Sequence, residues 1–300
     1  MRLASVKIFG AFVLAGAFLA APVRLAAQNP DDMMPAESEA KARQILQDAI
    51  TALGGPAYLN VRDITYTGRL GTFGHSGELN GFGHFIDYEI PPYKERQENL
   101  PKRNIIGIYN GDKGWDLDRG GISDKSPSDL AKWQGDLQFD IDYILRHRID
   151  EKGMIIRYGG PDIIELKEAD WVQLVDPDND TIRIGFARAS HLPIQETVEV
   201  RDRVTQYVTN YRFYYSNYHP IDGVMTPFQI ARERNGIKVF QAFFDKCEYN
   251  TGLTDSLFTR ESLEERWAKV GKKQTEKEAK KQAAEDKADA NSSSDSSKPN

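Results

Sequence analysis

Turns too short to hold a helix separate most of the strand-like segments of this chain, and this spacing limits the fold more than any other feature. Asn110-Gly111, Asp176–Asp180 and Asn235-Gly236 carry the residues that favour hairpin turns. Strands joined by such turns run antiparallel, whereas a parallel pair needs a long crossover connection. We therefore expect an antiparallel sheet and not a doubly wound α/β fold.

Alternation of apolar and polar residues begins near residue 61 and predicts strands through most of the remaining chain. The candidate strands are 63–71, 78–90, 93–100, 103–109, 114–118, 153–158, 162–168, 170–176, 181–188, 194–201, 204–216, 224–234 and 237–248. The predicted class is therefore mainly β with an α+β arrangement.

Two segments have helical periodicity instead. Residues 37–53 repeat apolar residues every three or four positions and stop at Gly54-Gly55-Pro56. Residues 126–148 do the same, with Ser126 or Ser128 as the cap and Gly135 as a point where the helix can split. The two stripes are Ala42, Ile45, Leu46, Ala49, Ile50 and Leu53, and Leu130, Trp133, Leu137, Ile141, Ile144 and Leu145. Each stripe needs a surface to bury it, and a large curved sheet is the one available.

The ends of the chain differ from its middle. Arg2 and Lys7 precede an apolar run that is too short to span a membrane comfortably, and small residues follow it up to Ala27. The predicted parts are a signal peptide over 1–27, a flexible leader over 28–36, the folded domain over 37–260, and a charged, largely disordered tail over 261–300. No cysteine lies near residue 27 to carry a lipid, so we expect a periplasmic protein without a lipid anchor.

Charge and motif content argue against several functions. The net charge of −6 comes from both signs, so nucleic acid is not an expected partner. The five histidines form no metal-binding helix spacing, and neither a Gly-x-Ser-x-Gly elbow nor a glycine-rich phosphate loop is present. The single cysteine, Cys247, is expected to be a packed thiol. We therefore predict no catalytic residue, no metal and no cofactor.

Two short stretches resemble parts of functional sites. Residues 176–180, with the sequence DPDND, begin like a calcium loop but lack its glycine and distal glutamate, so an Asx-rich turn explains them. His219 and Asp222 lie close in sequence and could form an acid–base pair or metal ligands. Pro220 and Gly223 favour a turn between two strands as the simpler explanation.

The late strands are richer in apolar and aromatic residues than a sheet with one wet face requires. The alternating sets are Ile182, Ile184 and Phe186, then Tyr211, Phe213 and Tyr215, and finally Val239, Phe240, Phe243 and Phe244, which occupy both faces. This surplus can pack beneath the helices or line a cavity.

Four stretches, in this order, resemble the LolA/LolB-like periplasmic lipoprotein-carrier superfamily. They are the helix end ALGG (52–55) with the strand DITYTGRL, the basic strand PPYKERQE (91–98), the hairpin YNGDKGW (109–115), and the late hairpin YHPIDGVMTPFQI (218–230). The resemblance covers most of residues 37–260. This chain is longer than the carriers and has a charged tail that they lack.

The resemblance implies an unclosed antiparallel β-barrel of about eleven strands, with helices plugging the concave side over an apolar cavity for acyl chains. Residues 126–148 match the plug. Arg96 falls on the family's arginine strand, where an arginine helps to govern lid opening, although a surface strand arginine explains it equally well. Trp115 is expected on the barrel wall near the lid, or alternatively in simple core packing.

We therefore expect a soluble, monomeric carrier that binds acyl chains of lipoproteins or lipids and exchanges them with membrane-protein donors and acceptors of the envelope. The predicted ligand-binding residues, from strand parity and helix stripe, are Leu46, Ile50, Arg96, Tyr109, Trp115, Trp133, Leu137, Ile141, Ile184, Phe186, Phe213 and Phe243. The alternatives are a protein-binding or envelope-sensing module without lipid cargo and, third, an envelope hydrolase.

Overall fold

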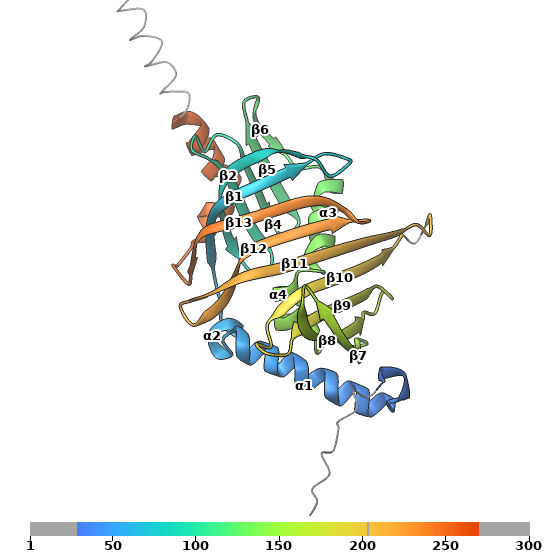
Figure 1. Cartoon of the computed structure of the whole chain (residues 1–300). Coiled ribbons are helices and arrows are strands. Elements are labelled where there is room, and N and C mark those ends of the chain that lie inside the picture. Colours follow the sequence, from blue (N-terminus) through green and yellow to red (C-terminus); the bar gives the residue numbers. More distant parts are fainter. Residues whose placement is uncertain (1–28, 203, 270–300) are drawn as a thin grey trace, which may run out of the picture.

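The computed structural model describes residues 29–202 and 204–269 (Figure 1). The predicted signal peptide and residues 270–300 of the predicted tail lie outside the described residues. Within the described part, no helix is both long and apolar enough to cross a lipid bilayer.

Thirteen strands form one antiparallel sheet in the described part of the chain. They are β1 (Ile64–Phe73), β2 (Leu79–Ile90), β3 (Lys94–Leu100), β4 (Ile106–Asn110), β5 (Lys113–Asp118), β6 (Gly121–Asp124), β7 (Ile155–Ile164), β8 (Lys167–Val175), β9 (Thr181–Ala187), β10 (Pro193–Arg201), β11 (Val208–Ile221), β12 (Val224–Arg234) and β13 (Ile237–Tyr249). The predicted strand 153–158 and the first part of the predicted strand 162–168 form one strand, β7, whereas residues 167–168 begin β8; β6 was not predicted.

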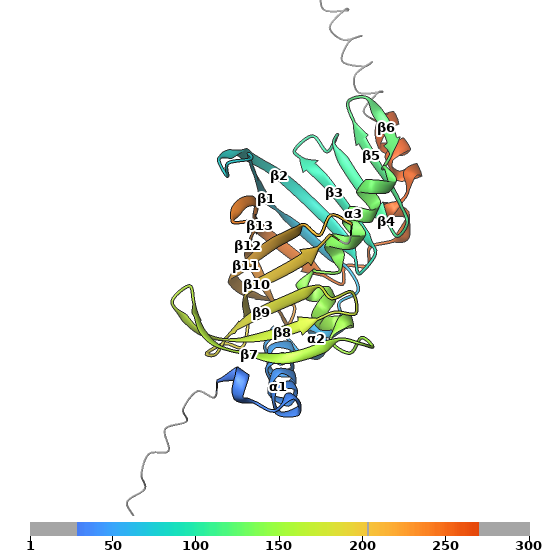
Figure 2. The ribbon, with the colours of Figure 1, turned by 90° about the vertical axis from the view of Figure 1, so that its right-hand side faces the viewer.

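The strand order follows the chain with one exception. It runs β6-β5-β4-β3-β2-β1-β13-β12-β11-β10-β9-β8-β7, so the first strand pairs with the last at the centre of the sheet. The edges are β6 and β7, which do not pair with each other, and the sheet curves without closing (Figures 1 and 2). This confirms the predicted unclosed antiparallel barrel, with thirteen strands rather than about eleven.

The first helix closes one end of the curved sheet. Helix α1 (Pro35–Leu53) buries its predicted stripe against β7 and β8, and Gly54 ends it with φ +129°. A short 3-10 helix (Pro30–Asp32) precedes it, and α2 (Pro56–Leu59) follows. The main core lies between α1 and the strands β7 to β10, where Leu46, Ile184 and Phe186 are almost completely buried.

The predicted helical segment 126–148 links the two edges of the sheet. It contains α3 (Pro127–Leu137), α4 (Ile141–Tyr143) and a π-helical turn (Ile144–Arg148). The Ser126 side chain accepts a hydrogen bond from Asp129 N at 3.1 Å, which confirms Ser126 as the N-cap. The helix is interrupted after Leu137 rather than at Gly135, and Asp140 caps the second piece. These helices lie over one face of the sheet, which we call the inner face (Figure 2).

The opposite, outer face carries a second core. Ile106, Ile108 and Leu117 pack there against Phe258 and Leu263 of the C-terminal segment. This segment contains a 3-10 helix (Asp255–Phe258) and a helix over residues 260–269. Folded structure thus extends past residue 260, where the tail was predicted to begin.

We predict that the C-terminal segment stabilises the domain. Because Phe258 is fully buried, Phe258→Ala should lower the free energy of unfolding by about 3–5 kcal/mol, measured by urea denaturation. Trp267, which is 41% exposed, is the control, and Trp267→Ala should change it by less than about 0.5 kcal/mol. Equal effects of the two substitutions would contradict this account of the segment.

Candidate cavity on the inner face

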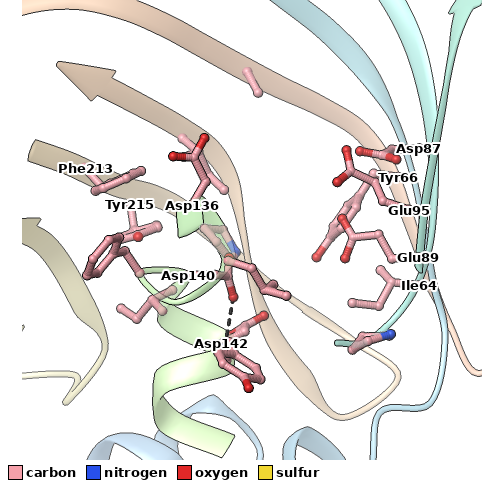
Figure 3. A pocket seen from close by; sticks show the side chains of 18 of the residues that line it. Ile64, Tyr66, Asp87, Glu89, Glu95, Asp136, Asp140, Asp142, Phe213 and Tyr215 are labelled. Atoms are coloured by element: carbon pink, nitrogen blue, oxygen red, sulfur yellow. Dashed lines mark hydrogen bonds between the residues drawn. The ribbon is translucent and has the colours of Figure 1, made fainter. Parts of the chain in front are cut away.

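A cavity of about 600 Å³ lies between the inner face of the sheet and the helices α3 and α4. Strands β1, β2 and β3 form one wall, β11, β12 and β13 form another, and the helices cover it (Figure 3). Much of the lining is apolar or aromatic, including Ile64, Phe85, Phe139, Phe213, Ile230 and Phe244. This volume is within the range of about 300–1,000 Å³ that is usual for ligand pockets.

Tyrosine side chains line the cavity with their rings and hydrogen-bond at their hydroxyl ends. Tyr215 donates to Glu196 at 2.7 Å, Tyr218 donates to the carbonyl of Pro193 at 2.7 Å, and Tyr58 donates to Asp142 at 2.7 Å. Tyr66 stacks on Phe244 with ring centroids 4.6 Å apart. With three of these hydroxyls occupied, the tyrosines present mainly carbon surface to a ligand.

The sheet wall also carries three carboxylates. Asp87 and Glu89 of β2 alternate with outward residues, and Glu95 of β3 lies opposite Glu89 in the strand pairing. Burial raises the pKa of all three carboxyls, and repulsion by Glu95 raises the pKa of Asp87 and Glu89 further. Trp133 Nε1 of α3 donates to Glu95 Oε2 at 2.6 Å, which partly opposes the shift at Glu95.

The helix side adds carboxylates at the break between α3 and α4. Asp140 Oδ1 accepts a hydrogen bond from Tyr143 N at 2.9 Å, while Asp142 lies 3.4 Å from Arg146. Burial and the neighbouring Asp142 raise the pKa of Asp140 to about 6. The cavity therefore combines an apolar body with acidic groups on two facing walls (Figure 3).

Part of the predicted ligand-binding set lines this cavity. Trp133, Leu137 and Ile141 reach it from the helices, and Phe213 reaches it from β11. The helical stripe thus lies over the cavity, and its role in ligand binding stays a prediction.

Five other predicted residues lie on the inner side but not in the cavity wall. Leu46, Ile50, Ile184 and Phe186 are in the main core beneath α1, with at most 4% of their surface exposed. Tyr109 stacks on Trp133 under α3, with ring centroids 4.8 Å apart. These side chains point toward the interior as predicted, but neighbouring side chains cover them and separate them from the cavity.

Three predicted residues face outward. Arg96 is buried on the outer face, where it pairs with Glu98 at 2.6 Å and donates to the carbonyl of Leu257 at 2.8 Å. Trp115 packs half-buried beside the outer core, which agrees with the packing alternative rather than the barrel-wall position near the lid. Arg96 is thus neither on the cavity side nor a simple surface arginine.

Phe243 faces outward for a different reason. A bulge in the β1–β13 pairing, between Thr67 and Gly68, shifts the register of β13 by one residue. Cys247 and Tyr249 point inward beyond the bulge, whereas Phe244 points inward before it. Alternate residues counted back from Cys247 without the bulge therefore include Phe243 among the inward ones. In the structure Phe243 lies on the outer face and contacts Phe82.

The other candidate motifs form turns. Asp176 Oδ1 accepts hydrogen bonds from the backbone N–H of Asp178 at 3.0 Å and of Asp180 at 2.9 Å, as an Asx turn requires. His219 lies 3.1 Å from the Asn217 side chain, and no hydrogen bond joins His219 to Asp222 within the described residues. No group of three metal-binding side chains is found in residues 29–202 and 204–269.

Sequence reasoning missed the cavity carboxylates. Asp87 and Glu89 share the parity of Phe85 in a predicted strand, and Asp140 and Asp142 lie in the predicted helical segment. That alternation was a usable signal, because acidic residues on the same strand face as an apolar residue are unusual.

Comparison with known proteins identifies the fold. No protein-family model matches the chain, and no curated protein matches it in sequence. A DUF1329 family protein from Desulfovibrio piger has a TM-score of 0.53 and 11% identity, over 74% of this chain and 98% of that chain. A LolA superfamily protein from Nitrosomonas europaea has a TM-score of 0.49 and 12% identity, over 74% and 99%. At 11% identity, the similarity to the DUF1329 family protein concerns the fold alone.

We predict a pH-dependent stability from Glu196, which is fully buried beside the cavity with Oε1 unpaired. Burial raises the pKa of its carboxyl from 4.5 to about 8. Folding therefore favours the protonated carboxyl. The stability that this carboxyl contributes is fully present below pH 4.5 and is lost as the pH rises through about 8. Across this interval, wild type should lose about 1.4 kcal/mol of unfolding free energy per pH unit relative to the neutral variant Glu196→Gln.

The measurement is urea denaturation of wild type and variant at several pH values between 4.5 and 8. The exposed Glu199 of the same strand is the control, and Glu199→Gln should follow the wild-type profile. A constant difference between Glu196→Gln and wild type at every pH would contradict the assignment.

Proposed function

We propose that the protein is a carrier that binds the acyl chain of a lipid or lipoprotein in the inner-face cavity and passes it on without covalent chemistry. The observation that carries this proposal is the cavity of about 600 Å³ with its largely apolar and aromatic lining. The fold resemblance read from the sequence supports the same conclusion.

The expected affinity is adequate for a carrier. Burial of hydrocarbon contributes about 0.8 kcal/mol per methylene, so a chain of about twelve methylenes contributes about 10 kcal/mol before association costs of about 4 kcal/mol or more. The net value allows binding that is firm yet reversible. No covalent step is needed to load or release such a ligand.

Helix α3 is suited to act as a movable cover. None of its described side chains is fully buried. Its contacts with the sheet include the Trp133–Glu95 hydrogen bond, the Trp133–Tyr109 ring stack, and a hydrogen bond from Gln134 Nε2 to the carbonyl of Gly111 at 3.0 Å. Separating few and partly exposed contacts costs little compared with opening a packed core.

The proposed setting is the periplasm, where a monomeric carrier would receive its cargo from one envelope membrane protein and deliver it to another. The predicted signal peptide supports export. Absence of a metal-binding or nucleophile motif in the sequence agrees with a binding role rather than catalysis.

We predict that Leu137→Glu weakens binding of a fluorescent fatty-alcohol probe at least about ten-fold, because it introduces an unpaired charge into the apolar cover. Ala131→Glu, an exposed position of the same helix outside the cavity lining, is the matched control and should bind as wild type does. Circular dichroism checks that both variants fold. Equal binding by wild type and Leu137→Glu, or no binding by wild type, would contradict the proposal.

A further inference from the structure

The charges around the cavity do not balance. Six carboxylates line it, from Asp87, Glu89, Glu95, Asp136, Asp140 and Asp142. Each lysine and arginine that lines it has a carboxylate partner, and Arg146 Nε and Arg232 Nε are buried without a hydrogen bond in the described structure. Arg146 pairs with Asp142, and Lys132 and Arg232 both pair with Asp136. Lys94 pairs with Asp255, outside the cavity lining, at 2.5 Å.

Four carboxylates therefore remain without a cation. No ion pair joins Asp87, Glu89, Glu95 or Asp140 to a lysine, arginine or histidine within the described residues. Asp87 is only 9% exposed, and its Oδ1 atom has no hydrogen-bond partner in the described structure. Figure 3 shows Asp87, Glu89 and Glu95 on one wall, with Asp140 and Asp142 on the helix across from them.

We propose that the cargo is a cationic amphiphile, with an apolar chain in the cavity and a positively charged nitrogen held by Glu89 and Glu95, which are paired neighbours on β2 and β3, on the wall opposite Asp140. The inference rests on the proposed function, because the apolar lining supplies the place for the chain. A long-chain amine or an amine-bearing lipid has this chemistry.

The surrounding groups favour an organic cation. An unpaired carboxylate in a low-dielectric cavity is unfavourable, and a bound ammonium group supplies the missing opposite charge. Aromatic faces such as those of Tyr66 and Phe244 also attract cations. No group of three metal-binding side chains occurs in the described part of the chain, which favours a nitrogen cation over a metal. A phosphate or carboxylate headgroup would be repelled.

Protonation agrees with this arrangement. The groups that face Glu89 are Asp87, Glu95 of β3, Asp140 at the N-cap of α4, Asp142 of α4, and Arg146 of the π-helical turn. Burial and the neighbouring carboxylates raise the pKa of Glu89, so protons neutralise the empty cavity in part. An ammonium ligand favours the ionised carboxylates, and its binding should therefore release protons to the buffer.

The test compares ligands that share a chain and differ in charge. Dodecylamine, dodecanol and dodecanoate compete with a fluorescent probe for the full chain, and propylamine serves as a cation without the chain. The double variant Glu89→Gln/Glu95→Gln removes two carboxylates from the wall. Asp112→Asn/Asp118→Asn, at exposed sites in the β4–β5 and β5–β6 hairpins, makes the same change in charge elsewhere. Circular dichroism establishes that both variants fold.

Wild type and the control should bind dodecylamine at least about ten-fold more tightly than dodecanol, with dodecanoate weakest. In Glu89→Gln/Glu95→Gln the preference for the amine should fall to about one, with dodecanol binding nearly unchanged. Calorimetry of dodecylamine binding in two buffers of different ionisation enthalpy should show proton release for wild type and for Asp112→Asn/Asp118→Asn. The variant Glu89→Gln/Glu95→Gln should show none.

Each other outcome has a distinct meaning. Equal binding of dodecylamine and dodecanol, tighter binding of dodecanoate, or an amine preference that survives Glu89→Gln/Glu95→Gln would overturn the cation inference and leave the acyl-chain cavity standing. Equal binding of propylamine and dodecylamine would contradict both the acyl-chain function and the amphiphile as cargo. No binding of any probe would overturn both.

Discussion

The pairing of β1 with β13 determines the arrangement of the rest of the molecule. It joins the first and last strands at the centre of the sheet, so the strands formed in mid-chain, β6 and β7, become its two distant edges. The chain between β6 and β7 must therefore travel from one edge to the other. It does so as α3, α4 and the π-helical turn across the inner face. A short helical bridge over a strongly curved sheet cannot fill the whole concavity, and the cavity occupies the remaining space.

The composition of the cavity wall reflects a conflict between two requirements. Burial of hydrocarbon favours the apolar and aromatic lining, whereas Asp87, Glu89 and Glu95 add polar groups that a purely structural core would avoid. Two buried carboxylates outside the cavity are paired with arginines, Glu98 with Arg96 and Asp176 with Arg148 at 3.1 Å. Under the proposed function, the unmatched carboxylates of the cavity serve a ligand rather than the fold.

The sequence was sufficient for the architecture and for part of the site. Strand periodicity and hairpin turns gave the antiparallel sheet, and the helical stripe gave Trp133, Leu137 and Ile141 as lining residues. It failed where geometry beyond one strand decides. The bulge in β13 exchanges Phe243 for Phe244. Arg96 lies on the opposite face of β3 from Glu95, where Leu257 and Ser262 of the C-terminal segment accept its hydrogen bonds. Ile184 has the right parity, but it packs in the core beneath α1, the helix that carries Leu46, and so does not line the cavity.

Native mass spectrometry of the full chain, purified from a bacterial envelope without detergent, tests the central claim most directly. The account predicts one added mass per chain, and an organic extract of the sample should contain a molecule with an acyl or alkyl chain. A protein that shows only its own mass, and that takes up neither fatty alcohol nor fatty amine when these are added, would contradict the claim that the inner-face cavity is a binding site.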